Sequence, residues 1–256
     1  MERRQARPSG WSGAPDCMKL LAIDSSGMVA SVAIVTDGIL TGEFTVNHKK
    51  THSQTLLPML DELVQMTGLD LHEIDAVAVA GGPGSFTGLR IGSATAKGLA
   101  LVLEKPIVSV PTVDALAYNL YGAEGLICPM MDARRQQVYT GIYHFEGEEM
   151  VTDLAQAPMK IDAIAERLNE SGRMVTLLGD GIPVYLDRLK GLLTVPYRIA
   201  PPHVNRQRAA AVGALVALYY REGRTQTAAE HTPDYLRLSQ AEREYAEKIA
   251  AGKAES

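Results

Sequence analysis

Cysteine is scarce in this sequence. Cys17 and Cys128 are the only two among 256 residues, and they show neither metal-ligand spacing nor a C-x-x-C pair. This usage is typical of a reducing compartment and argues against a disulfide framework or a structural zinc site. The chain also lacks an apolar run near the roughly 18 residues of a membrane span, and its start lacks the apolar segment of a signal peptide. We therefore expect a cytoplasmic protein with no membrane contact.

An excess of basic residues is also missing. Lys and Arg number 25 against 30 Asp and Glu, which gives a net charge of −5 and a pI near 5.7. Such a chain does not collect nucleic acid by bulk electrostatics, so any contact with RNA must be local or shared with a partner. Hydrophobic residues make up 46%, enough for the core of one large domain or two ordinary ones.

Composition and periodicity divide the chain into four segments. Residues 1–17 are rich in Arg, Pro and Gly without periodicity, and we expect a disordered extension there. Residues 241–256 are rich in Ala, Glu and Lys and are expected to form a solvated tail. The patterned sequence between them predicts an N-terminal lobe over 18–121 and a C-terminal lobe over 122–240.

The predicted elements follow one order twice. In the first copy, strands are expected at 18–24, 30–36 and 39–46, a helix at 53–66, a strand at 76–80, a helix at 87–103, a strand at 107–110 and a helix at 113–121. Asp37-Gly38 between the second and third strands is a preferred pair for a type I′ hairpin turn. In the second copy, strands are expected at 126–132, 137–145 and 150–154, a helix at 162–169, a strand at 175–178 and a helix at 184–190.

An aspartate, Asp24 or Asp132, closes the first strand of each copy. Two βββαβα units in series indicate a duplicated lobe. The order predicts the α/β fold of the actin, sugar-kinase and heat-shock ATPase (ASKHA) class, in which two similar lobes face each other across a cleft.

The stretch "AGGPGSFTGLRIGSATAKGLALVL", from Ala80 to Leu103, predicts a strand end, a glycine loop and a helix. A Walker loop is excluded because Gly88 is followed by Leu89 and Arg90 rather than by Lys and Ser or Thr. The dinucleotide pattern G-x-G-x-x-G fails at Thr87, where the third glycine should stand. A tight strand-to-helix turn explains the glycines better than a phosphate site does.

Two helices carry an apolar pattern that predicts a subunit contact. Small residues recur every four positions in the second helix and form one smooth ridge, made of Gly88, Gly92, Ala96 and Ala100. In the first helix the apolar residues cover an arc of about 180°, more than one core face needs; they include Leu56, Leu57, Met59, Leu60, Leu63 and Val64. We expect both sets to contact another subunit, so Leu60→Glu or Gly92→Arg should dissociate an oligomer without unfolding it.

Few residues are candidates for chemistry. Asp24, Ser25 and Ser26 stand where the ASKHA fold places its first phosphate hairpin, so they are the candidates for residual nucleotide binding. The matching turn after Asp132 has no glycine, so half of an ATP clamp is expected to be missing. His48 and His52 have H-x-x-x-H spacing, but a surface loop and a helix start explain them better than a metal does.

Six segments together resemble one protein family. "LLAIDSS", "HSQTLLPMLDEL", "AVAVAGGPGSFTGLRIGSATAKGLAL", "SVPTVDALA", "MDARRQQVY" and "PDYLR" are similar to the TsaB family, and the G-P-G-S-F-T-G-L-R run is highly specific. The resemblance covers residues 18–139, with a short echo at 233–237.

The resemblance implies an ASKHA fold and a non-catalytic subunit of the bacterial machinery that makes threonylcarbamoyladenosine (t6A) beside the tRNA anticodon. TsaB pairs with its paralogue TsaD, or with itself when TsaD is absent, through the two helices just described. TsaD transfers a threonylcarbamoyl group from an adenylate made by TsaC, and the ATPase TsaE joins the TsaB–TsaD complex. TsaD carries its metal-binding H-x-x-x-H where this chain reads residues 111–116 without histidine. The resemblance therefore implies no cofactor or metal here, and contact with tRNA only through the complex.

Three alternatives remain open at this point. An ATP-dependent kinase of the ASKHA class would use Asp24 and Asp132 and would bind Mg·ATP. A metallopeptidase-like protein would hold a metal. Direct tRNA contact would involve Arg134 and Arg135, although surface arginines are often only paired with nearby acids.

Overall fold

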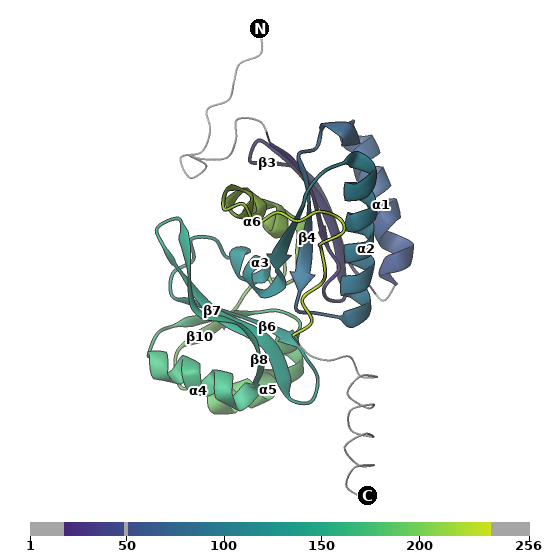
Figure 1. Cartoon of the computed structure of the whole chain (residues 1–256). Coiled ribbons are helices and arrows are strands. Elements are labelled where there is room, and N and C mark those ends of the chain that lie inside the picture. Colours follow the sequence, from purple (N-terminus) through teal and green to yellow (C-terminus); the bar gives the residue numbers. More distant parts are fainter. Residues whose placement is uncertain (1–17, 49–50, 237–256) are drawn as a thin grey trace, which may run out of the picture.

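The computed structural model describes residues 18–48 and 51–236. The expected extension at 1–17 and tail at 241–256 therefore lie outside the described residues. In the described part, two five-stranded sheets have the orders β3-β2-β1-β4-β5 and β10-β9-β6-β7-β8. Counted from the first strand of each lobe, these are the same order, 3-2-1-4-5. The duplicated βββαβα unit and the ASKHA fold predicted from the sequence are confirmed (Figure 1).

The first sheet has mixed strand directions. It consists of β1 (Lys19–Asp24), β2 (Val29–Thr36), β3 (Ile39–Asn47), β4 (Ala76–Gly82) and β5 (Ile107–Pro111). β1 pairs antiparallel with β2 and parallel with β4, and β4 pairs parallel with β5. Asp37 and Gly38 have φ values of 52° and 78°, so the left-handed backbone of the predicted type I′ turn is present.

Alternate side chains of these strands enter two different cores, because successive residues of a strand point to opposite faces. One core lies under α1 (His52–Thr67) and α2 (Phe86–Leu103) and contains Leu21, Ile23 and Val77. The single turn η1 (Leu71–Glu73) leads from α1 into β4. The opposite core contains Leu20, Ala22 and Val108, which lie under α3 (Thr112–Tyr118) and α6 (Ala209–Arg221).

The second lobe repeats this plan. Its strands and helices are β6 (Leu126–Asp132), β7 (Gln137–Glu146), β8 (Glu149–Lys160), α4 (Ile161–Ser171), β9 (Val175–Leu178), α5 (Gly181–Leu192) and β10 (Tyr197–Ile199). β8 is longer than predicted, since it pairs with β7 along its whole length with register shifts near Ile142. β10 was not predicted, because three mostly exposed residues leave no periodic signal.

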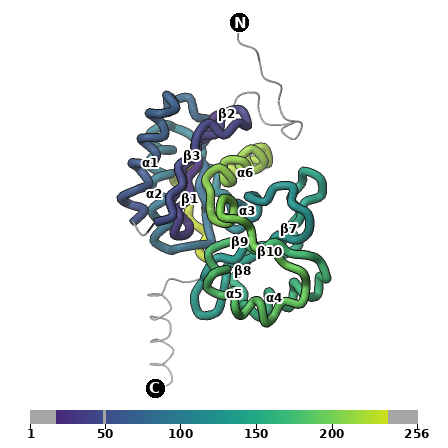
Figure 2. Tube along the Cα trace, turned by 180° about the vertical axis from the view of Figure 1, so that it is seen from behind, coloured from purple at the N-terminus to yellow at the C-terminus, as the bar shows by residue number. Residues whose placement is uncertain are grey.

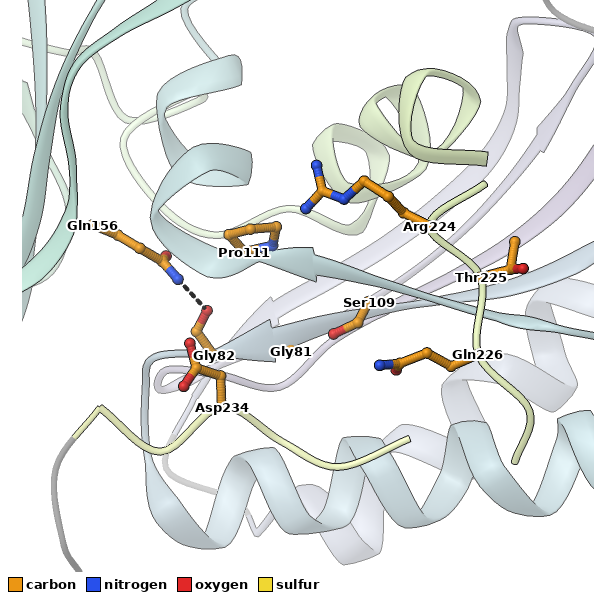
Figure 3. A pocket seen from close by; sticks show the side chains of 9 residues that line it. All are labelled: Gly81, Gly82, Ser109, Pro111, Gln156, Arg224, Thr225, Gln226 and Asp234. Atoms are coloured by element: carbon orange, nitrogen blue, oxygen red, sulfur yellow. Dashed lines mark hydrogen bonds between the residues drawn. The ribbon is translucent and has the colours of Figure 1, made fainter. Parts of the chain in front are cut away.

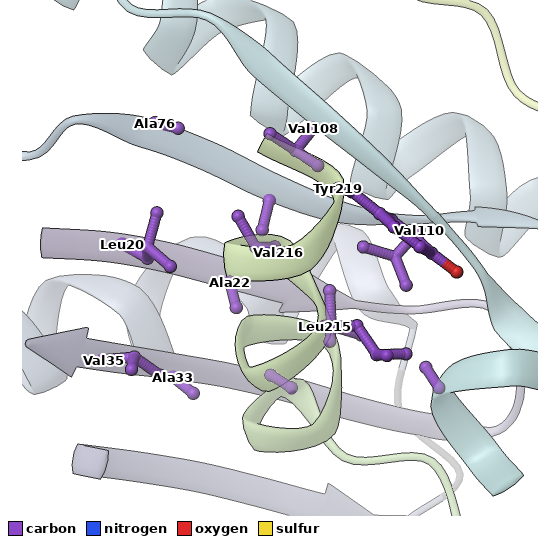
Figure 4. Close-up of a cluster of buried hydrophobic side chains, with 14 of the residues drawn as sticks. Leu20, Ala22, Ala33, Val35, Ala76, Val108, Val110, Leu215, Val216 and Tyr219 are labelled. Atoms are coloured by element: carbon purple, nitrogen blue, oxygen red, sulfur yellow. The ribbon is translucent and has the colours of Figure 1, made fainter. Parts of the chain in front are cut away.

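The prediction that residues 122–240 form only the C-terminal lobe is wrong. α6 lies against β1 and β2 of the first sheet, as the view from behind in Figure 2 shows. Its buried residues Leu215 and Val216 pack in one cluster with Leu20 and Ala22 (Figure 4), and Val212 belongs to the same cluster. The chain returns because the inner face of the first sheet is apolar and α3 covers only part of it.

Apolar contacts and side-chain hydrogen bonds join the lobes. Val113 and Leu116 of α3 are buried against Ile127 and Met131 of β6. Asp114 accepts hydrogen bonds from the Tyr143 hydroxyl of β7 at 2.7 Å and from the Tyr219 hydroxyl of α6 at 3.1 Å. Burial raises the pKa of Asp114, while both tyrosine bonds act in the opposite direction.

Candidate functional site

The end of β1 holds the three candidate nucleotide residues in a closed turn. Asp24 Oδ1 accepts hydrogen bonds from the Ser26 backbone N–H at 2.9 Å and from the Ser26 hydroxyl at 2.6 Å. Burial raises the pKa of Asp24 to about 6, against the opposing effect of the two Ser26 bonds and of nearby His52. The Ser25 hydroxyl donates to the Gly88 carbonyl oxygen at 2.9 Å. Asp24 Oδ1 and the Ser25 hydroxyl are therefore committed to local structure, whereas the buried Asp24 Oδ2 has no hydrogen-bond partner among the described residues.

A cavity of about 520 Å³ lies between the lobes at this turn. Ser26 lines it, whereas Asp24 and Ser25 do not. The first lobe also contributes the turn before β2 and the start of α2, and the second lobe contributes the ends of β6 and β9 with the start of α5. Its walls include Gly27, Met28, Gly84, Ser85, Phe86, Leu89, Met131, Asp132, Ala133, Arg134, Tyr139, Asp180, Val184, Asp234, Tyr235 and Leu236.

The turn after Asp132 reaches left-handed backbone without glycine. Arg134, Arg135 and Gln136 have φ values of 64°, 53° and 59°. Each such residue costs roughly 1–2 kcal/mol relative to right-handed backbone. The turn is held from both sides, since Asp132 Oδ1 accepts the Arg134 N–H at 2.9 Å and Arg188 donates to Gln136 Oε1 at 2.7 Å. The absence of glycine therefore does not exclude a tight turn here. Nucleotide binding in the cavity stays a prediction.

The glycine loop is shaped by backbone packing. A methyl group at Gly84 would overlap the Ser26 carbonyl oxygen, and one at Gly88 would overlap the Ser25 carbonyl oxygen. The Ser85 N–H donates to the same Ser26 oxygen at 2.6 Å, and the Ser85 hydroxyl caps α2 by accepting the Gly88 N–H at 3.3 Å. Glycine allows the turn after β1 to lie directly against the first turn of α2.

The glycine loop also contacts the distant "PDYLR" segment. The Asp234 N–H donates to the Gly81 carbonyl oxygen at 2.7 Å. The Tyr235 ring lies 4.8 Å from the Phe86 ring, and the Arg90 guanidinium lies 4.0 Å from the Phe86 centroid on the ring face. Two motifs of the sequence resemblance that lie about 130 residues apart are therefore neighbours in the fold. Arg237 lies outside the described residues.

The predicted subunit-contact ridge faces the wrong way. Gly88, Gly92, Ala96 and Ala100 are all buried, and Ala96 and Ala100 belong to the core between α2 and the sheet. A methyl group at Gly92 would overlap the Ser25 hydroxyl. Gly88 and Gly92 are small because the turn after β1 passes close to α2, and Ala96 and Ala100 are buried in the core, so these four residues cannot themselves contact another subunit.

Most of the apolar residues predicted to form a contact surface on α1 are also buried or partly buried. Leu56, Leu60 and Leu63 are buried against the sheet, and Met59 and Val64 are partly buried at its edge. Only Leu57 of the six predicted contact residues is strongly exposed. Leu60→Glu and Gly92→Arg should consequently unfold the lobe, contrary to the expectation from the sequence.

A different set of residues forms the outer surface of this helix pair. The exposed fractions are 55% for Leu57, 69% for Met66, 72% for Leu101 and 76% for Val102. Ala94 is also exposed on α2, and Gly98 has open space above it. The apolar and small residues of this outer surface are visible in the sequence. Their spacing alone does not show which face of each helix packs on the sheet.

The histidine pair does not form a metal site in the described part of the chain. His52 begins α1, and its Nε2 donates to the Gly27 carbonyl oxygen at 2.8 Å. No group of three or more His, Cys, Asp or Glu side chains suited to a metal occurs among the described residues. Within the same ranges, every helix is too short or too polar to cross a membrane.

Comparison with known proteins adds sequence relatives to this geometry. A family model described as "TsaD: tRNA N6-adenosine threonylcarbamoyltransferase" matches residues 42–245. The tRNA threonylcarbamoyladenosine biosynthesis protein TsaB of Bacillus subtilis (strain 168) is 34% identical over 236 residues, which cover 90% of this chain and 99% of the relative. The protein of the same name from Escherichia coli (strain K12) is 33% identical, with 86% and 95% covered. The solved structure of YeaZ from Pseudomonas aeruginosa has a TM-score of 0.72 at 28% identity, with 85% and 99% covered.

Two facing βββαβα lobes with a cavity between them define a protein of the ASKHA class. The relatives specify it further, because two of them exceed 30% identity over nearly their whole length. This chain belongs to the TsaB family.

Proposed function

We propose that this chain is a non-catalytic subunit of t6A biosynthesis that binds TsaD through the outer faces of α1 and α2. Its curated relatives are described as t6A biosynthesis proteins. The observation that carries the proposal is the outer surface defined by Leu57, Met66, Leu101 and Val102, each more than half exposed. Exposed apolar side chains that gather on one surface mark interaction sites, and Met66, Leu101 and Val102 gather at the carboxyl ends of α1 and α2.

The direction of the two helices supports one continuous surface. α1 connects β3 to β4, and α2 connects β4 to β5. The strands β3, β4 and β5 all run parallel to β1. The helices therefore run in the same direction and bring Met66, Leu101 and Val102 toward the same end of the lobe. Gly98 would let a partner helix approach closely, because nothing stands above its Cα.

The remaining parts of the proposal concern partners and setting. The chain forms a homodimer when alone and a heterodimer with TsaD when both are present. TsaE binds the TsaB–TsaD complex, and tRNA is contacted only through that complex. The chain works in the cytoplasm and needs no cofactor of its own.

The burial of Asp24 supports a non-catalytic role. A kinase of the ASKHA class would need this carboxylate at the nucleotide, yet Asp24 is directed into its own turn and does not line the interlobe cavity. Mg·ATP binding to the isolated chain separates the two functions, since the kinase requires it and the scaffold does not. Tight, saturable Mg·ATP binding that Asp24→Asn abolishes would favour the kinase.

The direct test measures absolute mass by light scattering after gel filtration, for the chain alone and mixed with TsaD. We expect a homodimer that converts to a one-to-one complex, and we expect Leu101→Glu or Gly98→Arg to prevent both assemblies while far-UV circular dichroism stays unchanged. Leu218→Glu is the matched control, because Leu218 is an exposed apolar residue on α6 at the opposite face of the sheet. A monomer that ignores TsaD, or equal dissociation by Leu218→Glu, would contradict the proposal.

A further inference from the structure

Three aromatic side chains contact one another where the β7–β8 hairpin meets the turn that follows α3. The ring centroids of Tyr118 and Tyr121 lie 5.4 Å apart, and the Phe145 centroid lies 6.1 Å from that of Tyr118 and 5.3 Å from that of Tyr121. Tyr121 is 49% exposed, whereas the other two rings are partly buried. The cluster therefore presents aromatic surface to the solvent.

Hydrogen bonds hold the hairpin in place against the first lobe. The Gln156 side chain of β8 donates through Nε2 to the Gly82 carbonyl oxygen at 3.3 Å (Figure 3) and accepts the Val113 N–H through Oε1 at 3.3 Å. The Tyr143 hydroxyl of β7 donates to Asp114 of α3 at 2.7 Å. β7 lies beside α3 in both views of the chain (Figures 1 and 2). The aromatic cluster is therefore a fixed surface, and a partner does not have to order it on binding.

The end of the hairpin adds negative charge to this surface. Residues 144–153 contain four acidic residues and neither Lys nor Arg. Two of the four contact His144, whereas Glu148 and Glu149 are exposed and have no ion pair in the described part of the chain. Burial and the negative charge of Glu148 both raise the pKa of Tyr121, which is consistent with a carboxylate near that ring. We call the combined surface the hairpin patch; it consists of Tyr118, Tyr121, Phe145, Glu148 and Glu149.

A surface of this composition suits a chain segment that carries arginine and proline. Guanidinium groups bind carboxylates and also lie over aromatic faces. Proline-containing segments bind surfaces lined with aromatic rings, because their extended conformation loses little entropy. Residues 3–15 of this chain have the matching composition, since they contain three arginines, two prolines and no acidic residue.

The same segment enters the described structure within reach of the hairpin patch. Met18 is buried in the hydrophobic cluster against which Tyr118 and Met150 pack. Arg7 precedes Met18 by eleven positions, and an extended chain of that length spans up to roughly 36 Å. The short connection also keeps the segment at an effective concentration in the millimolar range near the patch.

We propose that residues 3–15 bind the hairpin patch of their own chain. The arginines pair with Glu148 and Glu149 and lie over the Tyr121 ring, while the prolines contact the remaining aromatic surface. Such binding suits a segment that has no apolar periodicity from which to build a core. The inference does not depend on the proposed assembly with TsaD, because α1 and α2 cover the opposite face of the first sheet from α3.

Fluorescence provides the test, because Trp11 is the only tryptophan of the chain and reports on this segment alone. We expect acrylamide to quench Trp11 at least about twofold less in the full chain than in the free peptide 1–17, since the effective concentration favours the bound state. Raising the salt concentration to about 0.5 M should bring the two closer, because exposed ion pairs are screened. Equal quenching in the chain and the peptide at low salt would overturn the proposal.

Variants of the patch locate the binding. Glu148→Lys and Glu149→Lys, combined in one chain, should raise the quenching of Trp11 to nearly that of the peptide. Tyr121→Leu should weaken binding about two- to fivefold, because it removes the aromatic face and keeps apolar bulk. Glu170→Lys is the matched control, since Glu170 is exposed on α4 of the same lobe, and it should behave like the wild type. No release in the double variant, or equal release by Glu170→Lys, would refute the site; thermal melts establish that each variant is folded.

Variants of the segment test the same contact without changing the folded lobes. Replacing Arg3, Arg4 and Arg7 together by Gln should release Trp11 as the double variant of the patch does. Quenching in the wild type should also stay constant over a dilution series, because the contact lies within one chain. Quenching that rises on dilution would show binding between two copies and would overturn the assignment, as would a triple variant that behaves like the wild type.

Discussion

Two glycines of α2 should respond in opposite ways to alanine. Gly88 lies on the buried face of the helix, where a methyl group would overlap the Ser25 carbonyl oxygen. Gly98 lies on the outer face with nothing within contact distance. Both have helical backbone in one helix, so the pair isolates packing from helix propensity.

The two substitutions should change the free energy of unfolding in opposite directions. At Gly98, alanine should stabilise the protein by about 0.4–1 kcal/mol, because it reduces the freedom of the unfolded chain without a clash. At Gly88 the same gain is exceeded by overpacking, which costs about 1–3 kcal/mol, and by weakening of the Ser25 hydrogen bond to the Gly88 carbonyl oxygen, which costs about 1 kcal/mol. The net result for Gly88→Ala is a loss of about 1–3 kcal/mol.

Urea unfolding and thermal melts at neutral pH provide the assay. For a chain of this size, 1 kcal/mol corresponds to about 2–4 °C in Tm, so the two variants should lie on opposite sides of the wild type. If both raise Tm, the turn after β1 yields easily and the close-packing explanation of the glycine motif is wrong. If both lower it, Gly98 has no free space in the assembled protein, as expected if the partner subunit of the proposed homodimer packs directly on it.

Three further predictions concern buried groups. The folded pKa of Asp24 is about 6, above its ordinary 3.8, so the native state binds more protons than the unfolded state between these pH values. The free energy of unfolding should therefore fall by up to about 3 kcal/mol as pH rises from about 4 to about 6. Asp24→Asn should flatten this dependence in urea titrations, and an unchanged profile would contradict the prediction. Asp114→Ala should cost about 1–3 kcal/mol, because the Tyr143 and Tyr219 hydroxyls lose their acceptor, with a lowered urea midpoint as the readout. Burial raises the pKa of Cys128 to about 12, so a Cys17→Ser variant should resist alkylation at pH 8 until urea is added; rapid labelling of the native protein would show that Cys128 is accessible.

The sequence predicted most strands and helices because each lobe has clear local signals. Asp37-Gly38 marks the first hairpin, and β1 alternates residues between two apolar cores. The order of these elements was enough to predict the ASKHA fold. The resemblance to the TsaB family came from motifs, and the curated relatives confirm it.

The orientation of the helices could not be obtained in the same way. Four-residue spacing groups Gly88 with Gly92, and equally groups Ala94 with Gly98, but it does not identify which group meets the sheet. The decisive fact is the path of Ser25 and Ser26 across α2, which is a long-range contact. Likewise, the apolar sequence of α6 does not reveal that its partner is the sheet formed about 190 residues earlier in the chain.

The return of α6 to the first sheet has a consequence for synthesis on the ribosome. Translation proceeds from the N-terminus at about 5–20 residues per second, and domains usually fold as they emerge. Here the first sheet is complete in sequence at Pro111, yet one of its apolar faces lacks its main cover until Arg221 has been made. The nascent chain must therefore keep that face from aggregating for roughly 5–20 seconds. The first lobe is therefore completed only after the second lobe has been synthesised.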